Sequence, residues 1–117
     1  MTHAIHCAVV TTLTGRTLGY PEAKVVSTGC AALTMNLSIL ALQAVVAEQD
    51  TEPTSRQREQ FRAHPEASVR LLRAVRVDDV DWLATVEHHH EHTDGKCGAR
   101  GPIEVCAAAH LLQAADV

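Results

Sequence analysis

Apolar residues recur at helical spacing along most of the chain, and this pattern constrains the fold more than any other feature. Ile5, Val9 and Leu13 follow one another at four-residue steps. Such spacing places side chains on one stripe of a helix. No segment alternates apolar and polar residues as a half-buried strand does. The sequence therefore predicts an all-α fold, a compact bundle of about six helices.

Local signals divide this pattern into separate helices. Gly19 is typical of a residue that ends a helix, and Asn36 predicts a break or bend in the long run that follows. Thr54 and Gln57 fit a capping box. His64 precedes Pro65 and so predicts a helix boundary, because the residue before proline avoids the α region. The helices are expected over residues 3–18, 21–47 with the break, 54–63, a segment containing 69–75, 78–90 and 103–115.

Composition limits the size of the fold and the class of partner. With 117 residues, 46% hydrophobic and 21% charged, the chain is expected to form one domain over residues 1–117. Only Tyr20, Phe61 and Trp82 are aromatic, so the core must be aliphatic. The net charge of −4 argues against a nucleic-acid polymer as the ligand.

Hydropathy and cysteine spacing indicate a cytoplasmic protein. The longest apolar stretch, near residues 39–47, is interrupted by Gln43, so no membrane span is expected. The N-terminus lacks the pattern of a secretory signal. The four cysteines form no Cys-x-x-Cys pair and are predicted to be reduced thiols.

The segment "TVEHHHEHTDGKCGARG" (85–101) holds half of the eight histidines. Consecutive helical side chains point about 100° apart, yet two adjacent histidines at a helix end can converge on one metal ion. Imidazole suits zinc, iron, nickel and manganese. Histidines near a helix C-terminus are also common as surface residues, since they interact favourably with the helix dipole. The run alone leaves both interpretations open.

Other polar residues are equally ambiguous when taken singly. His64 could be a buried, hydrogen-bonded side chain or a ligand. Asp94 and Gly95 form a turn signal, and Asp116 could be a solvated charge. The chain contains no P-loop and no Ser-His-Asp motif, so nucleotide-fold and serine-hydrolase functions have no support.

Three segments in order resemble the HD-GYP family, a branch of the HD metal-dependent phosphohydrolases. They are "HPEASVRLLRAV" (64–75), "WLATVEHHHEHTDGKCGARG" (82–101) and "AAAHLLQAADV" (107–117). The family pattern there is His-Pro-Glu before a Leu-Leu helix, His-His-Glu-x-x-Asp-Gly-x-Gly-Tyr-Pro, and a helix that ends Ala-Asp. The early segment at residues 3–40 follows the family order too, so the resemblance covers nearly the whole chain, and it implies an HD-domain-like helical bundle.

The resemblance also implies a ligand set. His64, His89 and His90 match three family ligands that gather on one metal, and His3 and Asp116 match two others. Motif positions that are expected to shape the adjoining loop are Glu91, Asp94 and Gly95. The remaining histidines of this region, His88, His92 and His110, fall outside the pattern and are expected to be surface or packing residues. In the family, two or three iron or manganese ions activate water for cleavage of cyclic di-GMP.

The sequence departs from the family at its defining His-Asp pair, where Met35 and Asn36 stand instead. A thioether and a neutral amide are weaker ligands than an imidazole and a bridging carboxylate. The neighbouring lysine position is Ile39, and the Gly-Tyr-Pro positions hold Cys97, Gly98 and Ala99. Cys97 could supply a thiolate. The chain stops just after Asp116, where the family domain continues with further helices. We expect at most one divalent transition metal (iron, manganese, zinc or nickel) and no second metal.

The expected function is a degenerate HD-GYP-like domain of bacterial signalling with lost or reduced phosphodiesterase activity. Its partner would be another signalling protein or domain, or a second copy of the chain. The alternative is a metal-dependent phosphohydrolase, acting on cyclic di-GMP or another phosphoester through the residual site. A third interpretation is a module that binds cyclic di-GMP without cleaving it, using Arg70, Arg73 and Arg100 for the phosphates.

Overall fold

The computed structural model describes residues 2–90 and Leu112. This part is helical and contains no strand, which confirms the all-α class. Its elements are α1 (Thr2–Thr17), α2 (Glu22–Thr34), the 3-10 turn η1 (Leu37–Ile39), α3 (Leu40–Glu48), α4 (Ser55–Ala74) and α5 (Val80–His88). The helix predicted over residues 103–115 lies outside the described residues.

Two helices end where a left-handed residue closes the last turn. At the end of α1, Gly19 has a positive φ of 80°. Its N–H donates to the Arg16 carbonyl at 3.0 Å, and the next N–H, that of Tyr20, donates to the Gly15 carbonyl at 2.9 Å. This arrangement satisfies carbonyls that the helix leaves without partners, and it confirms Gly19 as the end of α1. Arg76 (φ 69°) ends α4 in the same way, although a side chain in this conformation is strained.

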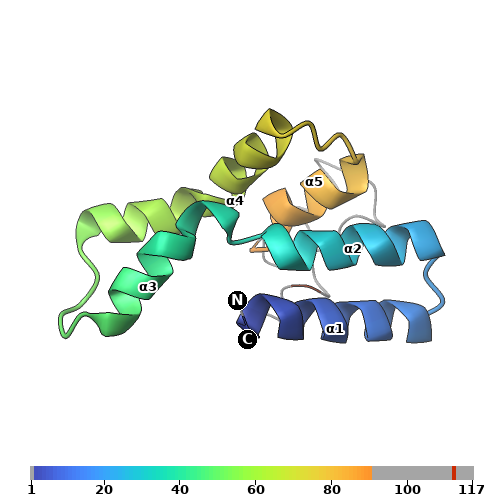
Figure 1. Cartoon of the computed structure of the whole chain (residues 1–117), viewed down its shortest axis with the longest axis horizontal. Coiled ribbons are helices and arrows are strands. Elements are labelled where there is room, and N and C mark those ends of the chain that lie inside the picture. Colours follow the sequence, from blue (N-terminus) through green and yellow to red (C-terminus); the bar gives the residue numbers. More distant parts are fainter. Residues whose placement is uncertain (1, 91–111, 113–117) are drawn as a thin grey trace.

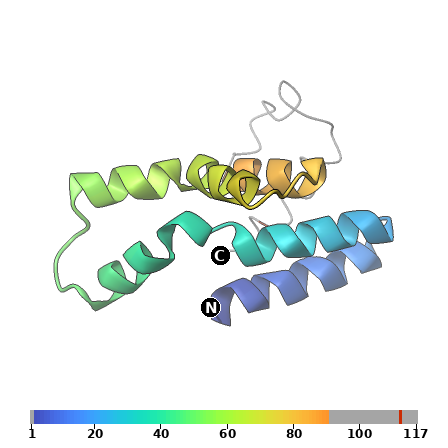
Figure 2. The same cartoon turned by 45° about the horizontal axis from the view of Figure 1, so that its top comes forward.

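Helices α1 and α2 form an antiparallel pair, seen side by side in Figures 1 and 2. The buried face of α1 consists of Cys7, Thr11 and Gly15. The stripe of Ile5, Val9 and Leu13 predicted the helix but is exposed, at 55%, 50% and 58%. Small residues take the inner face because they let two helix backbones approach closely.

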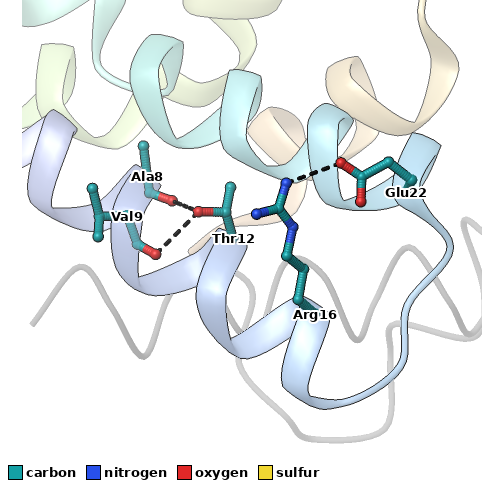
Figure 3. A network of polar contacts seen from close by, with 5 residues as sticks. All are labelled: Ala8, Val9, Thr12, Arg16 and Glu22. Atoms are coloured by element: carbon teal, nitrogen blue, oxygen red, sulfur yellow. Dashed lines mark hydrogen bonds and ion pairs between the residues drawn. The ribbon is translucent and has the colours of Figure 1, made fainter.

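Close contact between α1 and α2 depends on Thr12 and Gly29. A Cβ atom on Gly29 would lie 2.8 Å from the Thr12 Cγ2 atom, too close for any side chain there. The Thr12 hydroxyl donates to the Ala8 carbonyl at 2.8 Å, so it brings no unsatisfied polar group to the interface (Figure 3). Arg16 then reaches Glu22 across the turn at 3.0 Å.

The core of the described residues is aliphatic, as the composition predicted. Trp82 packs only against its edge, and its indole N–H donates to Thr34 Oγ1 at 2.8 Å. The buried cluster comprises Cys7, Ala31, Ala32, Met35, Val69, Leu72, Leu83, Val86 and Leu112. It joins α1, α2, the second half of α4 and α5.

The predicted break near Asn36 is confirmed, because α2 stops at Thr34 and η1 precedes α3. The boundary predicted at His64–Pro65 is wrong: α4 runs through Pro65 without interruption. Proline bends a helix rather than ending it when other groups take over the bond that it cannot make. Figure 1 shows α4 changing direction between its two halves.

The molecule has two parts of different character, which we call the arm (residues 40–63) and the body (residues 2–39 and 64–90). No residue of the arm is buried, whereas the second half of α4 buries His64, Ser68, Val69 and Leu72. In both views the arm, made of α3 and the first half of α4, extends away from the body (Figures 1 and 2).

By length and apolar composition, residues Glu22–Glu48 could also cross a membrane. A core helix of a soluble protein and a signal sequence pass the same test, so the finding is weak evidence. The absence of a membrane span stays a prediction, as does the cytoplasmic location.

Candidate metal centre

Three histidines, one within α4 and two directly after α5, meet on the body, and we call them the histidine cluster: His64, His89 and His90. His64 lies within α4 directly before Pro65, and His89 is the C-terminal cap of α5 with near-helical backbone angles (φ −66°, ψ −15°). Val69 and Leu72 of α4 share the core with residues of α5, and this packing brings the helices together. Asp79 fixes the start of α5 by accepting the Trp82 N–H at 3.0 Å.

The ligand nitrogens of the histidine cluster all lie within 4.8 Å of one another. The His64 and His89 Nε2 atoms are 3.2 Å apart. Two imidazole nitrogens bound to one tetrahedral zinc ion at about 2.0–2.1 Å lie about 3.3–3.4 Å apart. The nitrogens of the two buried rings therefore already have the separation that one small metal ion requires.

Hydrogen bonds to backbone carbonyls define which ring nitrogen can bind a metal. His64 Nδ1 lies 2.5 Å from the Phe61 carbonyl, and His89 Nδ1 lies 2.5 Å from the Val86 carbonyl. A carbonyl only accepts, so both Nδ1 atoms must carry the hydrogen. In each neutral ring the lone pair is then on Nε2, which is the ligand arrangement found in metal-binding histidines.

Two Nε2 lone pairs that face each other at 3.2 Å repel, and a metal ion bound by both nitrogens would remove this repulsion. His64 and His89 are 4% and 0% exposed, so the surroundings of the two nitrogens are largely dry. His90 is exposed and gives the histidine cluster a side that faces solvent. The chemistry of the donors suits zinc, iron or nickel better than magnesium or calcium.

The residues at the positions where the resemblance predicts a His-Asp pair lie in different surroundings. Met35 is fully buried in the aliphatic core, in the cluster that contains Cys7 and Ala31. Ile39, at the lysine position, is also buried, and Asn36 is half-buried before η1. None of these side chains supplies an anionic ligand.

A chain of serine hydrogen bonds holds η1 against the backbone of His64. The Ser38 N–H donates to Ser68 Oγ, the Ser68 hydroxyl donates to Ser38 Oγ, and the Ser38 hydroxyl donates to the His64 carbonyl, each at 3.1 Å. The segment at residues 37–39 thus lies beside His64 of the histidine cluster. Sequence reasoning gave neither serine a role at this site, because a single serine carries no signal of which neighbour it bonds.

His3, the other predicted ligand among the described residues, is not part of the histidine cluster. His3 is exposed on α1, where its Nε2 atom lies 3.6 Å from Cys7 Sγ. His88 is buried, which fits the packing role expected of it, and its Nε2 atom lies 3.7 Å from Glu87 Oε2. Ten further residues considered from the sequence lie outside the described part of the chain: the motif-loop residues Glu91, Asp94 and Gly95, the Gly-Tyr-Pro positions Cys97, Gly98 and Ala99, the predicted ligand Asp116, and His92, Arg100 and His110.

Two further groups considered from the sequence have other partners. Arg70, considered for phosphate binding, is exposed and pairs with Glu66 at 3.0 Å. Cys7 is buried and contacts His3, and Cys30 is half-buried. Burial, and then the charge of Asp79, raise the pKa of the Cys30 thiol, so Cys30 stays protonated at neutral pH and is not a ready metal ligand.

Comparison of the chain with known protein families, with curated proteins and with solved structures gives no match. The class that the described residues define is therefore an all-helical domain with a three-imidazole cluster.

Proposed function

We propose that the chain is a degenerate HD-GYP-like signalling domain that binds one divalent transition metal and has lost or reduced phosphodiesterase activity. The observation that supports metal binding is the pair of facing Nε2 atoms of His64 and His89, whose Nδ1 atoms each contact a backbone carbonyl. His90 supplies the third nitrogen. In this proposal the six-helix HD-type bundle, with His3 and Asp116 as outer ligands, is the ancestral arrangement.

The restriction to one metal rests on the residues at the family's His-Asp positions. Two-metal hydrolysis holds its ions about 3.5–4 Å apart and clamps both oxygens of the phosphoester. Cations this close repel strongly unless a negatively charged group lies between them. Asn36 is neutral, and Met35 is committed to the aliphatic core. A single ion can still lower the pKa of a bound water, but it lacks the second clamp.

A regulatory or interaction role fits the exposed apolar side chains of the body. On α1 they are Ile5, Val9 and Leu13, each at least half exposed. Exposed apolar patches are typical of surfaces that contact another protein. We propose another signalling protein or domain, or a second copy of the chain, as the partner.

Metal analysis tests the first part of the proposal. Protein purified without chelator or affinity histidines should contain about one equivalent of a transition metal per chain, since the histidine cluster offers one site. His89→Ala should abolish this binding. His6→Ala changes an exposed histidine that lies outside the histidine cluster, and it should leave the metal content unchanged. Binding by the wild type that His89→Ala does not reduce would place the metal elsewhere.

A hydrolysis screen tests the second part. Cyclic di-GMP and the generic diester bis(p-nitrophenyl) phosphate should both remain intact with protein loaded in turn with manganese, iron, nickel and zinc. Turnover that His89→Ala abolishes would overturn the loss of activity. It would establish the alternative, a phosphohydrolase working with one metal, which the solvent-facing position of His90 favours.

A further inference from the structure

The bend of α4 brings a proline and a metal-ligand histidine to the same carbonyl. In an uninterrupted helix the N–H of residue 65 would donate to the carbonyl of residue 61, four positions earlier. Pro65 has no N–H, and its ring pushes that carbonyl aside. His64 Nδ1 lies 2.5 Å from this same Phe61 carbonyl. The side chain before the proline thus takes the bond that the proline cannot make.

The second buried ligand uses the same bond by a different route. His89 Nδ1 lies 2.5 Å from the Val86 carbonyl, again three residues earlier. Helix α5 ends at His88, so Val86 belongs to the last turn, where carbonyls have no intrahelical partner. In both ligands a carbonyl that is released from the helix receives the Nδ1 hydrogen. One is released by a proline and the other by the end of a helix.

We propose that Pro65 is a positioning residue of the histidine cluster. By leaving the Phe61 carbonyl to His64, it keeps the hydrogen of that ring on Nδ1 and directs Nε2 toward His89. The effect on metal affinity rests on the proposed function, whereas the effect on the tautomer does not. A proline that served only to bend α4 would leave the position of the ring hydrogen unchanged.

Pro65→Ala tests this inference because it restores the N–H that competes for the Phe61 carbonyl. In metal-free full-length wild type, nitrogen NMR of the imidazoles should show His64 with its hydrogen on Nδ1. In Pro65→Ala the population with the hydrogen on Nε2 should increase. Zinc affinity, measured by competition with a chromophoric chelator, should fall about 10–100-fold, as is usual when an outer-shell partner of a ligand is lost.

The thermal midpoint separates positioning from damage to the fold. Alanine favours a helix interior far more than proline, so the midpoint of Pro65→Ala should stay the same or rise while zinc affinity falls. General destabilisation would lower both. Pro21→Ala is the matched control: Pro21 is exposed and precedes α2, and its replacement should change neither the tautomer nor zinc binding. Pro65→Ser restores the same N–H and should repeat the shift of tautomer.

An unchanged His64 tautomer in both Pro65 variants would overturn the inference, whatever happens to zinc. If wild type binds no zinc but the tautomer shifts, the proposed function fails and the positioning role of Pro65 stands. If wild type binds zinc and the variants bind it equally well with an unchanged tautomer, the proposed function stands and the role of Pro65 is lost.

Discussion

The arm and the body are built from similar helices but are held together by different forces. In the body, α2 alone buries Val25, Ala31 and Ala32, and the second half of α4 adds Val69 and Leu72. In the arm, α3 buries nothing, although its sequence, LALQAVVAE, is the most apolar among the described α-helices. Apolar content therefore does not decide which helix is buried. What decides it is whether another element lies against the apolar face.

Short-range bonds dominate in the arm. Thr54 Oγ1 accepts the Gln57 N–H at 3.1 Å, and Gln57 Oε1 accepts the Thr54 N–H at 2.9 Å. The Gln57 side chain also bonds Gln49 across the loop at 3.0 Å. Arg62 pairs with Glu59 at 3.0 Å, but exposed pairs of this kind contribute about 0–1 kcal/mol. The described side-chain bonds that stabilise the arm thus lie mainly in the loop before α4 and at the start of α4.

The histidine cluster belongs to the body and starts where the arm ends. His64 is the first buried residue after the arm, and Pro65 bends α4 immediately after it. A metal ion on His64, His89 and His90 would connect α4 to the end of α5 and add to contacts that the core already makes. We therefore expect metal binding to stabilise the body and to leave the arm unaffected.

Met35→Ala should have the largest effect on stability among the changes considered for this comparison. Met35 is fully buried in the core, and removing such a side chain leaves a cavity that lowers the free energy of unfolding by about 2–5 kcal/mol. Leu40→Ala is the control in the arm, where the side chain is 46% exposed and the expected loss is within about 0.5 kcal/mol. Urea unfolding followed by circular dichroism measures both.

The result for Met35 also bears on the function. If Met35 faces only the core, Met35→Ala should leave the zinc affinity of the folded protein unchanged. A small loss of stability together with a large change in zinc affinity would show that Met35 belongs to the site and not to the packing.

Helix boundaries were the most predictable part of the fold, and burial was the least. Gly19, the break near Asn36 and the capping box at Thr54 all carry local signals, and each is confirmed. The stripe of Ile5, Val9 and Leu13 predicted α1 but not its inner face, because periodicity does not reveal which neighbour a helix meets. Small residues on the opposite face allowed the closer contact with α2.

The same limit applies to the candidate site. His64, His89 and His90 were grouped through the family resemblance, and in the structure one ring nitrogen of each lies within 4.8 Å of the other two. The carbonyls that orient these rings were not predicted. Every residue has a carbonyl, and only the local backbone conformation determines which carbonyl lacks its helical hydrogen bond and can accept one from a side chain. The helix boundary expected at Pro65 was wrong for a related reason: the His64 side chain bonds the carbonyl that the proline leaves without its helical donor.

Ser68→Ala should have the next largest effect and sharpens the comparison within α4. Ser68 is fully buried and accepts the Ser38 N–H, so its loss leaves a backbone donor without its acceptor, at a cost of about 1–3 kcal/mol. Ser55→Ala changes an exposed serine in the arm half of the same helix and should alter stability by less than about 0.5 kcal/mol. Equal losses in both variants would mean that the two halves of α4 do not differ as their burial indicates.

Thr54→Ala should have the smallest effect on the protein as a whole, although it removes the start of α4. The loss of a capping side chain costs about 1 kcal/mol, and in the arm this cost falls on a helix end that no other element covers. Hydrogen exchange of the amides at residues 55–58 should therefore become several-fold faster, because they open locally. Exchange at Val69 and Leu72, and zinc affinity, should not change. If instead Thr54→Ala lowered the global unfolding midpoint as much as Met35→Ala, the arm would be part of the cooperative unit, and the bend at Pro65 would not separate two regions of different stability.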